Sequence, residues 1–509
     1  MLLHLFGAML SKEKSDEIRS FLTDTSNLSG GHAERVVFPE TGKETAEILA
    51  HATRTATPIT VSGAGTGTVG GRVPFGGFVL ATDKLNQIKS IISENGENRA
   101  VAEAGVFLGD LQRAVEGKKL LYPPDPTERY CFLGGTVATN ASGARTFKYG
   151  PTRNYVRRLL LALPEGDLLN LSRGELMADE KGRFSLTLVS GRTINVQLPS
   201  YRMPDTRKNA SGYFVRPGMD ALDLFIGSEG TLGVIVEIEV KLLPKPEAIF
   251  SGVVFFSSES ELLAFVSDAR ARSFANRTEA AHSKPGIDAR ALEYFDIESL
   301  RFLREKYEKI PAESVGAIFF EQETTTATED LLFQEWQSLL ESHHALVDQS
   351  WFATDEVDQM RLREFRHQLP VLMNEWFSRY EQRKVSTDMA VPDGEFPALL
   401  SSYQEALRSM DLRYTIFGHI GDNHVHLNIL PRNNTEAARA REVYLTLVRR
   451  AIAAGGTVSA EHGIGKLKRP YLEMLYGETH LREMATLKRA FDPAGILGRG
   501  NIFSEEYLD

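Results

Sequence analysis

The chain of 509 residues contains one cysteine, Cys131. A single thiol excludes any internal disulfide and any metal site built on several cysteines, and it fits a reducing compartment. A basic excess is also missing, because 58 Lys and Arg face 68 Asp and Glu, for a net charge of -10. Nucleic-acid-binding domains are normally basic, so this balance argues against a nucleic-acid partner.

The sequence also lacks an apolar run long enough to cross a membrane. The N-terminal segment MLLHLFGAML is apolar over ten residues only, and it has neither the charged leader nor the cleavage site of a signal peptide. We interpret it as a short helix that packs on the body of the protein. We therefore expect a soluble, cytoplasmic protein, with peripheral attachment to the inner face of a membrane left open.

A chain of this length is expected to form two or three domains. Residues 1–35 indicate a helical lead-in, and residues 36–245 consist of short β-rich runs separated by glycines. Residues 246–455 alternate strands with single helices, which is typical of a sheet covered by helices on one face. Residues 456–509 are predicted to be helical and to return to the second of these regions. The expected fold class is α+β.

The run GAGTGTVGG at residues 63–71 contains a formal G-x-G-x-x-G pattern. A Rossmann loop leads directly into a helix, but here RVPFGGFVLAT follows, and Pro74 with its neighbouring glycines precludes a regular helix. The loop is therefore predicted to join a strand to a strand. Its successive backbone N–H groups can still cradle phosphates. A glycine-rich turn without a ligand is the plain alternative.

Two further blocks are rich in small residues: GGTVATNASG at residues 134–143 and IGSEGTLGVI at residues 226–235. Backbone without large side chains can run close against a large flat ligand. Three such loops in one domain are hard to explain as turns alone.

Histidines gather near the C-terminus in GHIGDNHVHLNIL (residues 418–430), which is followed by EHGIG (residues 461–465). His419 and His426 are seven apart and would lie on opposite faces of a continuous strand. The turn residues between them favour a hairpin instead, in which the two imidazoles converge. Glu461 could then complete a site of two histidines and one carboxylate, with a position open for a substrate oxygen.

His424 shares one face of its strand with His426 and Asn428, so it is a candidate for a supporting position beside this site. The plain alternative for any lone histidine in a strand is a structural role.

Together these blocks resemble the vanillyl-alcohol oxidase superfamily of flavoproteins, and within it the FAD-dependent D-2-hydroxy acid dehydrogenases that act on D-lactate, D-2-hydroxyglutarate or glycolate. The resemblance covers residues 36–504 and rests on five ordered blocks: the first glycine loop, PPDP with GGTVATNASG, GSEGTLG, the histidine block with EHGIG, and the terminal FDP. It implies a PCMH-type FAD-binding domain plus a C-terminal ferredoxin-like antiparallel sheet/helix substrate (cap) domain.

The resemblance also implies a bound FAD. The first glycine loop contains no histidine that could anchor a flavin, so non-covalent FAD is expected, and Cys131 is the one residue that could change this. The residues that the resemblance assigns to FAD contact are Gly63, Gly65, Thr66, Gly67, Gly134, Gly135, Thr139, Asn140, Gly143, Glu229 and Ile235.

The metal-dependent relatives imply that a divalent ion, zinc by preference, is held by His419, His426 and Glu461. Asn428 and His462 match the substrate side, and an imidazole titrates near working pH, so His462 is the expected general base. The usual Gly-Asn of the family is Asn423-His424 here, which adds a histidine beside the site.

The substrate carboxylate requires a fixed cation. Arg363 and Lys384 match the family positions for it, although the spacing between them is longer than expected. His367 stands where glutarate enzymes carry a threonine, which weakens the case for glutarate. For Arg361 and Arg366 a solvated helix face is an equal expectation.

The expected reaction is the oxidation of a D-2-hydroxy acid to the 2-oxo acid, with a hydride passing to flavin N5 and a metal assisting. The chain has no haem motif and no iron–sulfur cysteines, so electrons must pass to an external acceptor such as an electron-transfer flavoprotein, a quinone or a cytochrome. One alternative is a metal-independent FAD oxidase of the same fold acting on a sugar, an aldonolactone or an alcohol. Another is a non-catalytic flavin-binding subunit. The oligomeric state is not readable from the sequence.

Overall fold

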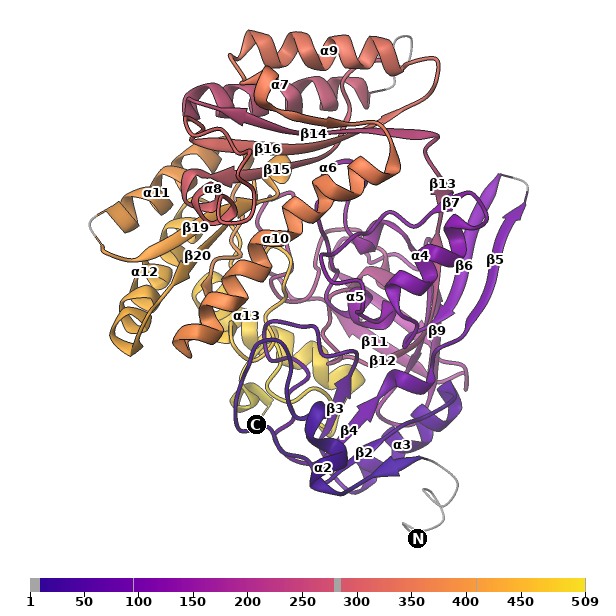
Figure 1. Ribbon diagram of the computed structural model, residues 1–509. Coiled ribbons are helices and arrows are strands. Elements are labelled where there is room, and N and C mark those ends of the chain that lie inside the picture. The colour runs from indigo at the N-terminus through magenta and orange to yellow at the C-terminus, as the bar shows by residue number, and fades with distance from the viewer. Residues whose placement is uncertain (1–9, 95, 279–284, 409, 509) are drawn as a thin grey trace.

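A computed structural model describes residues 10–94, 96–278, 285–408 and 410–508 (Figure 1). The helix expected over the apolar N-terminus falls outside these residues, apart from Leu10. The described part of the lead-in contains strand β1 (Ser11–Lys12), the single turn α2 (Ser15–Ile18) and the 3-10 turn η1 (Arg19–Phe21). Among the described helices, none is long and apolar enough to cross a bilayer.

The N-terminal half contains two larger sheets. The first has the strand order β1-β2-β4-β3, in which β4 (Phe78–Ala81) runs parallel to β2 (Arg35–Val37) and to β3 (Ile59–Ser62). Helix α3 (Gly42–Arg54) connects β2 to β3, and Thr41 caps it by accepting the Glu44 N–H at 3.1 Å. The second sheet is antiparallel and has the order β5 (Ile88–Glu94), β6 (Glu97–Glu103), β12 (Val234–Lys241), β8 (Val156–Ala162) and β9 (Leu168–Ser172).

The glycine-rich run at residues 63–71 leads from β3 to β4 (Phe78–Ala81), so the predicted strand-to-strand connection is confirmed. No described helix opens at its end, as a Rossmann loop would require. The remaining elements of this half are α4 (Leu108–Glu116), α5 (Leu133–Ala138), α6 (Thr146–Tyr149), the pair β7 (Leu120–Leu121) and β13 (Leu243–Pro244), and the hairpin of β10 (Arg183–Thr187) and β11 (Thr193–Gln197).

The C-terminal half is built on a seven-stranded antiparallel sheet, and the predicted α+β class with an antiparallel cap is confirmed. The alternation of strands with helices predicted over residues 246–455 is present, and four of the strands fall in the runs IFSGVVFFSS, AIFFEQE, YTIFGHIG and HVHLNILP. The sheet order is β17 (Trp351–Ala353), β14 (Ala248–Phe256), β16 (Gly316–Thr324), β15 (Ala289–Asp296), β19 (Arg413–Gly418), β20 (His426–Leu430) and β18 (Val385–Ser386).

Helices cover both faces of this sheet, so the expectation of a single covered face was wrong. Alternate residues of β14 enter two different cores: Val254 belongs to the core that includes Phe265 of α7, whereas Val253 and Phe255 belong to the core that includes Phe365 of α10. Figure 1 shows α7 and α9 on one side of the sheet and α8 and α10 on the other. The helices of this half are α7 (Glu259–Asn276), α8 (Ile297–Leu303), α9 (Glu329–Ser342), α10 (Glu356–Tyr380), α11 (Phe396–Arg408) and α12 (Asn434–Ala453).

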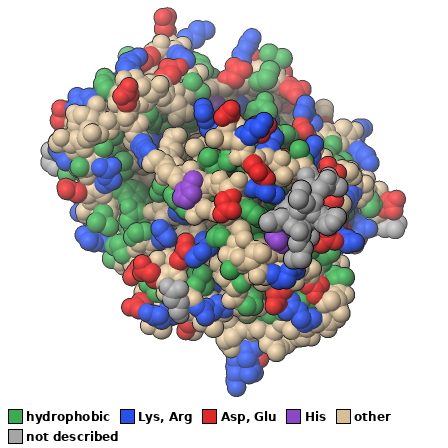
Figure 2. All heavy atoms as spheres, turned by 90° about the horizontal axis from the view of Figure 1, so that it is seen from below, with side chains coloured by type: hydrophobic (Ala, Val, Ile, Leu, Met, Phe, Trp, Pro, Cys, Tyr) green, Lys and Arg blue, Asp and Glu red, His purple; other side chains and the backbone are tan. Residues whose placement is uncertain are grey.

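After α13 (Arg469–Phe491) the chain returns to its N-terminal half, where the yellow segment lies beside β3 and β4 in Figure 1. The Ile59 N–H of β3 donates to the Ile496 carbonyl at 2.8 Å, and the Gly498 N–H donates to the Ile59 carbonyl at 2.9 Å. On the face shown in Figure 2, acidic and basic side chains are interspersed. The domain limits given above stay a prediction, since the sheets alone do not define independent folding units.

Candidate active site

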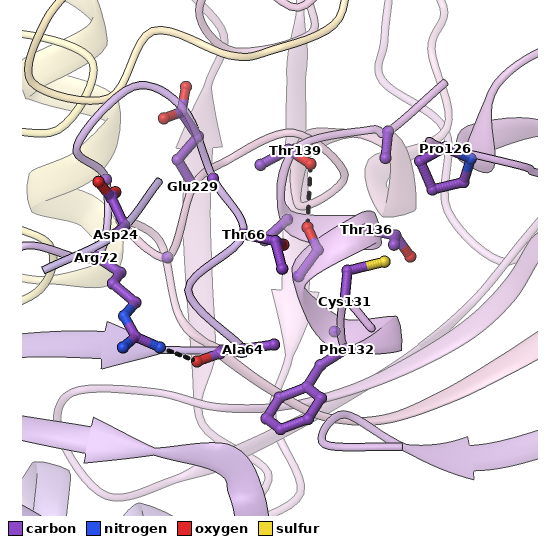
Figure 3. A pocket seen from close by; sticks show the side chains of 18 of the residues that line it. Asp24, Ala64, Thr66, Arg72, Pro126, Cys131, Phe132, Thr136, Thr139 and Glu229 are labelled. Carbon is purple, nitrogen blue, oxygen red and sulfur yellow. Dashed lines mark hydrogen bonds between the residues drawn. The ribbon is translucent and has the colours of Figure 1, made fainter. Parts of the chain in front are cut away.

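One cavity joins the small-residue loops of the N-terminal half to the histidines of the C-terminal half. Its volume of ≈ 330 Å³ is within the usual range of small-molecule sites. Three residues of the predicted metal and catalytic set line one part of it: His419, Glu461 and His462. The predicted cofactor residues that line it are Gly63, Gly65, Thr66, Gly67, Gly134, Gly135, Thr139, Glu229 and Ile235 (Figure 3).

Two predicted cofactor residues do not line the cavity. The Asn140 side chain accepts the Arg153 N–H at 2.9 Å, and its φ of 49° places it in the left-handed region. Gly143 is a glycine for packing reasons, because a Cβ there would lie 2.0 Å from the Asp125 carbonyl oxygen. Both residues therefore stabilise the loop through contacts on the side away from the cavity.

The glycines at the cavity surface fit a flavin dinucleotide. A Cβ built on Gly67 or Gly135 would meet no protein atom within 4 Å among the described residues, so protein packing does not require glycine at either position. The bare backbone instead leaves room for a ligand to approach closely. Cys131 also lines the cavity, and burial raises the pKa of its thiol to about 12. A protonated thiol is a poor nucleophile, which favours non-covalent FAD.

Filling this space should release the flavin without unfolding the protein. In Gly135→Val the added side chain projects into the cavity, and overpacking of about 1–3 kcal/mol weakens FAD binding by roughly tenfold for each 1.4 kcal/mol. Flavin content per chain after gel filtration measures the loss. Gly394→Val is the matched control, because a Cβ at Gly394 also meets nothing within 4 Å but lies outside the cavity. Full flavin retention in Gly135→Val would contradict this placement of the cofactor.

The predicted hairpin that brings His419 and His426 together is present. Strand β19 ends at Gly418, the turn η8 (Ile420–Asp422) follows, and Asn423 takes a left-handed φ of 52° before β20 begins at His426. The two strands pair antiparallel, and the two imidazole centroids lie 5.9 Å apart.

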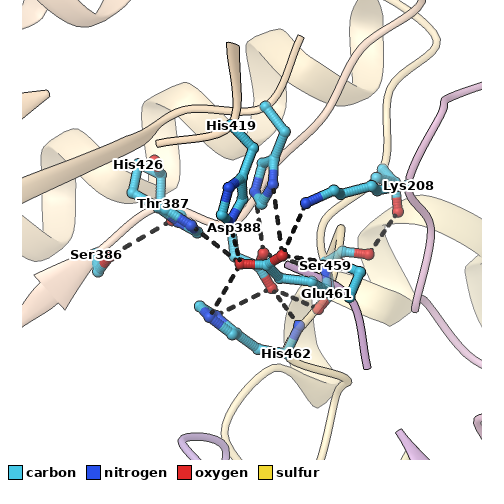
Figure 4. Close-up of polar contacts among 12 residues, drawn as sticks. Lys208, Ser386, Thr387, Asp388, His419, His426, Ser459, Glu461 and His462 are labelled. Carbon is cyan, nitrogen blue, oxygen red and sulfur yellow. Dashed lines mark hydrogen bonds and ion pairs between the residues drawn. The ribbon is translucent and has the colours of Figure 1, made fainter. Parts of the chain in front are cut away.

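In each of these imidazoles, Nδ1 lies at hydrogen-bond distance from an acceptor. His419 Nδ1 lies 2.6 Å from Glu293 Oε1, and His426 Nδ1 lies 2.8 Å from the Thr387 carbonyl oxygen. Because both partners accept, each Nδ1 carries the hydrogen and each Nε2 presents a lone pair. The two Nε2 atoms approach Glu461 Oε1 at 3.4 and 3.1 Å (Figure 4).

Residues of the N-terminal half hold the carboxylate of Glu461. Its Oε2 accepts from Ser142 Oγ at 2.9 Å and from the fully buried ammonium of Lys208 at 3.1 Å. Burial alone would raise the pKa of Glu461, but Lys208 and His419 hold it well below its usual range. The carboxylate therefore stays ionised and available to a cation.

Asp388 supports the same loop from the other side. It is fully buried and accepts the backbone N–H groups of Glu461 and His462 at 3.2 and 3.0 Å. Its Oδ2 also lies 3.3 Å from Nδ1 of His462. Burial lowers the pKa of His462 to about 4, against the opposing effect of Asp388, so the expectation that it titrates near working pH was wrong and the imidazole is neutral at neutral pH.

Sequence reasoning missed four of these supporting residues. For Asp388 a signal existed, because it stands four residues after the singled-out Lys384 and directly before the apolar run Met389-Ala390-Val391. Ser142 belongs to the GGTVATNASG block, which was predicted only to contact the flavin. Glu293 and Lys208 had no local signal, since their partners lie more than one hundred residues away.

The donor set fits a divalent metal. His419, His424, His426 and Glu461 each offer one donor atom, and these four atoms all lie within 4.8 Å of one another. Imidazole nitrogen together with one carboxylate oxygen is the donor set that zinc prefers.

The cations predicted to bind substrate lie in different surroundings. Lys384 is exposed and makes no hydrogen bond or ion pair to the described part of the chain. Arg363 Nε contacts Glu321 Oε1 at 3.0 Å, away from the histidines. Arg366 is mostly buried, and its Nε contacts Glu293 Oε2 at 2.9 Å, so it supports His419 through Glu293. Arg361 lies on the surface with Asp358.

Asn428 is buried on β20, where its Nδ2 donates to the His426 carbonyl at 3.3 Å.

Glu229 links the cavity wall to the EHGIG loop, because its two carboxylate oxygens accept the N–H groups of Ile464 and Gly465 at 2.8 and 2.7 Å. Burial raises the pKa of Glu229 to about 7, and these two amides oppose that shift. Glu229 therefore ties the flavin loops to the segment that carries Glu461.

The fold and the cavity are those of a flavin-linked oxidoreductase. Residues 33–172 match the FAD binding domain, and residues 251–502 match the C-terminal domain of FAD linked oxidases. The chain belongs to this family of FAD-linked oxidases, and the predicted resemblance to the D-2-hydroxy acid dehydrogenase group is confirmed.

Among curated relatives, the chain is 30% identical to glycolate oxidase subunit GlcD of Bacillus subtilis over 93% of this chain and 89% of that protein. It is 30% identical to a D-lactate dehydrogenase of Anaerostipes hadrus, over 96% of each chain. It is 27% identical to a D-2-hydroxyglutarate dehydrogenase of Stutzerimonas stutzeri, over 96% of this chain and 95% of that protein. A solved alkyldihydroxyacetonephosphate synthase shares the fold, with a TM-score of 0.66 at 14% identity over 98% of this chain and 84% of that one.

Proposed function

We propose that the protein oxidises a D-2-hydroxy acid to the 2-oxo acid, using non-covalent FAD and a divalent metal, zinc by preference, held by His419, His426 and Glu461. The observation that carries this proposal is the single cavity, which has flavin-type glycine loops at one end and His419, Glu461 and His462 at the other. The names of the relatives, which include D-lactate and D-2-hydroxyglutarate dehydrogenases, support this substrate class.

When bound, the flavin supplies a two-electron acceptor and the metal supplies a Lewis acid that lowers the pKa of a substrate hydroxyl. His462 takes the hydroxyl proton at Nε2, because its Nδ1 faces the Asp388 carboxylate and carries the hydrogen. This pairing with Asp388 fixes the tautomer and the ring orientation, as in other carboxylate–histidine pairs. His426 stacks on the same ring, with centroids 5.4 Å apart and planes inclined by 12°.

Lys384 is the cation that we assign to the substrate carboxylate. Although Lys384 as a residue is exposed, protein atoms around its ammonium displace water and lower its pKa, and the nearby Asp388 and Glu461 oppose this shift. Asn428 offers an amide on the same strand as His426. Arg363 remains in this set, although a substrate would have to compete with Glu321 for its guanidinium.

Electrons pass from the flavin to an external acceptor, for which an electron-transfer flavoprotein, a quinone or a cytochrome is suited. A cytoplasmic site of action, with or without peripheral membrane contact, belongs to the same proposal. The alternative of a metal-independent oxidase is disfavoured by the ionised, buried Glu461 amid three imidazoles.

An anaerobic flavin-reduction screen tests the proposal. Purified holoprotein is mixed with D- and L-lactate, glycolate and D- and L-2-hydroxyglutarate, before and after EDTA treatment, and the flavin absorbance is followed. We expect D-acids to bleach the flavin, L-acids to leave it oxidised, and EDTA to slow bleaching by about 100-fold or more until zinc is restored, since a Lewis acid contributes several kcal/mol. Equal bleaching by L-acids, or no effect of EDTA, would overturn it.

A further inference from the structure

His424 lies between the turn residue Asn423 and the start of β20, and its side chain is fully buried. Its ring centroid is 4.5 Å from that of His426 and 5.8 Å from that of His419. A neutral imidazole has one nitrogen with a hydrogen and one with a free lone pair.

The groups around His424 determine which of its ring nitrogens carries the hydrogen. Nε2 lies 3.2 Å from Asp388 Oδ1, and a carboxylate can only accept, so Nε2 carries the hydrogen. Nδ1 then holds the lone pair, and it lies 4.0 Å from Glu461 Oε2. Within the described part of the chain both ring nitrogens are buried without a geometric hydrogen bond, but Nε2 closely faces a carboxylate whereas Nδ1 does not. A buried acceptor without a donor is costly and indicates a missing ligand.

The same arrangement occurs at all three histidines. In each ring the outer nitrogen faces an acceptor, which is Glu293 for His419, the Thr387 carbonyl for His426 and Asp388 for His424. Each inner nitrogen faces Glu461. Outer acceptors that fix the tautomer are characteristic of histidines that ligate a metal.

We infer that His424 is a fourth protein ligand, through Nδ1, of the metal at His419, His426 and Glu461. This inference rests on the proposed function and deepens it. Four protein donors would suffice for the four-coordinate shell that zinc prefers, so a substrate hydroxyl would add to that shell instead of completing it. The metal is then held by the protein before substrate arrives and after product leaves.

X-ray absorption spectroscopy of the zinc-loaded holoprotein tests the inference directly. We expect three imidazoles and one carboxylate around zinc in the natural protein, and two imidazoles in His424→Asn. Zinc release to excess EDTA should be at least about tenfold faster in this variant, because loss of a supporting group already costs 10–100-fold in affinity. His480→Asn is the matched control; His480 lies on α13 with its Nδ1 on the Tyr476 carbonyl, and neither readout should change.

The outcomes separate this inference from the proposed function. Two imidazoles in the natural protein, or an unchanged zinc shell and release rate in His424→Asn, would overturn the fourth ligand while leaving the proposed reaction intact. A natural protein that binds no zinc and reduces its flavin in EDTA would overturn both. If His424→Asn does not fold, His424→Asp places a carboxylate oxygen near the Nδ1 position, and we expect it to retain zinc with oxygen in place of one imidazole.

Discussion

Replacing His462 by glutamine should lower the rate of flavin reduction by a D-2-hydroxy acid by about 10²–10⁴-fold, the usual contribution of a general base. The physical reason is that glutamine has no basic nitrogen to accept the hydroxyl proton. The backbone N–H of residue 462 still reaches Asp388, so the loop that carries Glu461 keeps its position. Anaerobic stopped-flow absorbance at saturating substrate measures the rate.

FAD and zinc content should be unchanged in His462→Gln, which separates loss of a base from loss of a cofactor. His480→Gln is the control for a histidine-to-glutamine change elsewhere in the C-terminal segment. A His462→Gln variant that reduces its flavin at the natural rate would remove His462 from the proton transfer.

Replacing Glu461 by glutamine should abolish zinc binding and slow flavin reduction by about 10³-fold or more, since Lewis-acid assistance is worth several kcal/mol. A neutral amide neither balances the charge of the cation nor offers an anionic oxygen. The change also leaves the buried ammonium of Lys208 with Asp422, 3.7 Å away, as its remaining anionic partner. Breaking a buried ion pair costs about 3–5 kcal/mol, so the free energy of unfolding should fall as well.

Two measurements keep these effects apart. Elemental analysis gives the zinc content, and thermal unfolding of the metal-free forms of both proteins gives the loss that is due to Lys208 alone. Glu483→Gln is the control, because Glu483 is a carboxylate of α13 that accepts from Ser200 at the surface. Natural zinc content in Glu461→Gln would contradict the assigned ligand set.

The sequence was most informative where a short segment determines its own shape. The turn between His419 and His426 predicted a hairpin because glycine, aspartate and asparagine favour turns, and the same turn residues are seen between β19 and β20. Pro74 and the glycines around it excluded a helix after the first loop for an equally local reason. Runs of small residues predicted most of the cavity wall, because backbone without large side chains can lie close to a ligand.

Features that depend on distant partners were not predictable. Strand β15 carries Arg290 and Glu293 inside a buried run, and these charges hide its strand pattern. They are tolerated because Arg290 pairs with Glu321, and Glu293 with Arg366 and His419.

On α10, Arg363 and Arg366 are one helical turn apart, so spacing alone could not show that Arg366 is the arginine that supports the histidines. The same limit applied to the cap as a whole, where a pattern of alternating strands and helices did not reveal that both faces of the sheet are covered.

The return of the C-terminal segment to β3 gives the enzyme an order of assembly. Lys466 Nζ donates to the Gly71 carbonyl at 3.2 Å, and the Asn501 side chain donates to the same oxygen at 2.9 Å, which closes loops of 395 and 430 residues. During synthesis these loops close only after the EHGIG segment has left the ribosome. Glu461 and His462 lie in the same late part of the chain as Lys466 and Asn501. A partly made chain therefore lacks Glu461, His462 and both side chains that hold the Gly71 carbonyl.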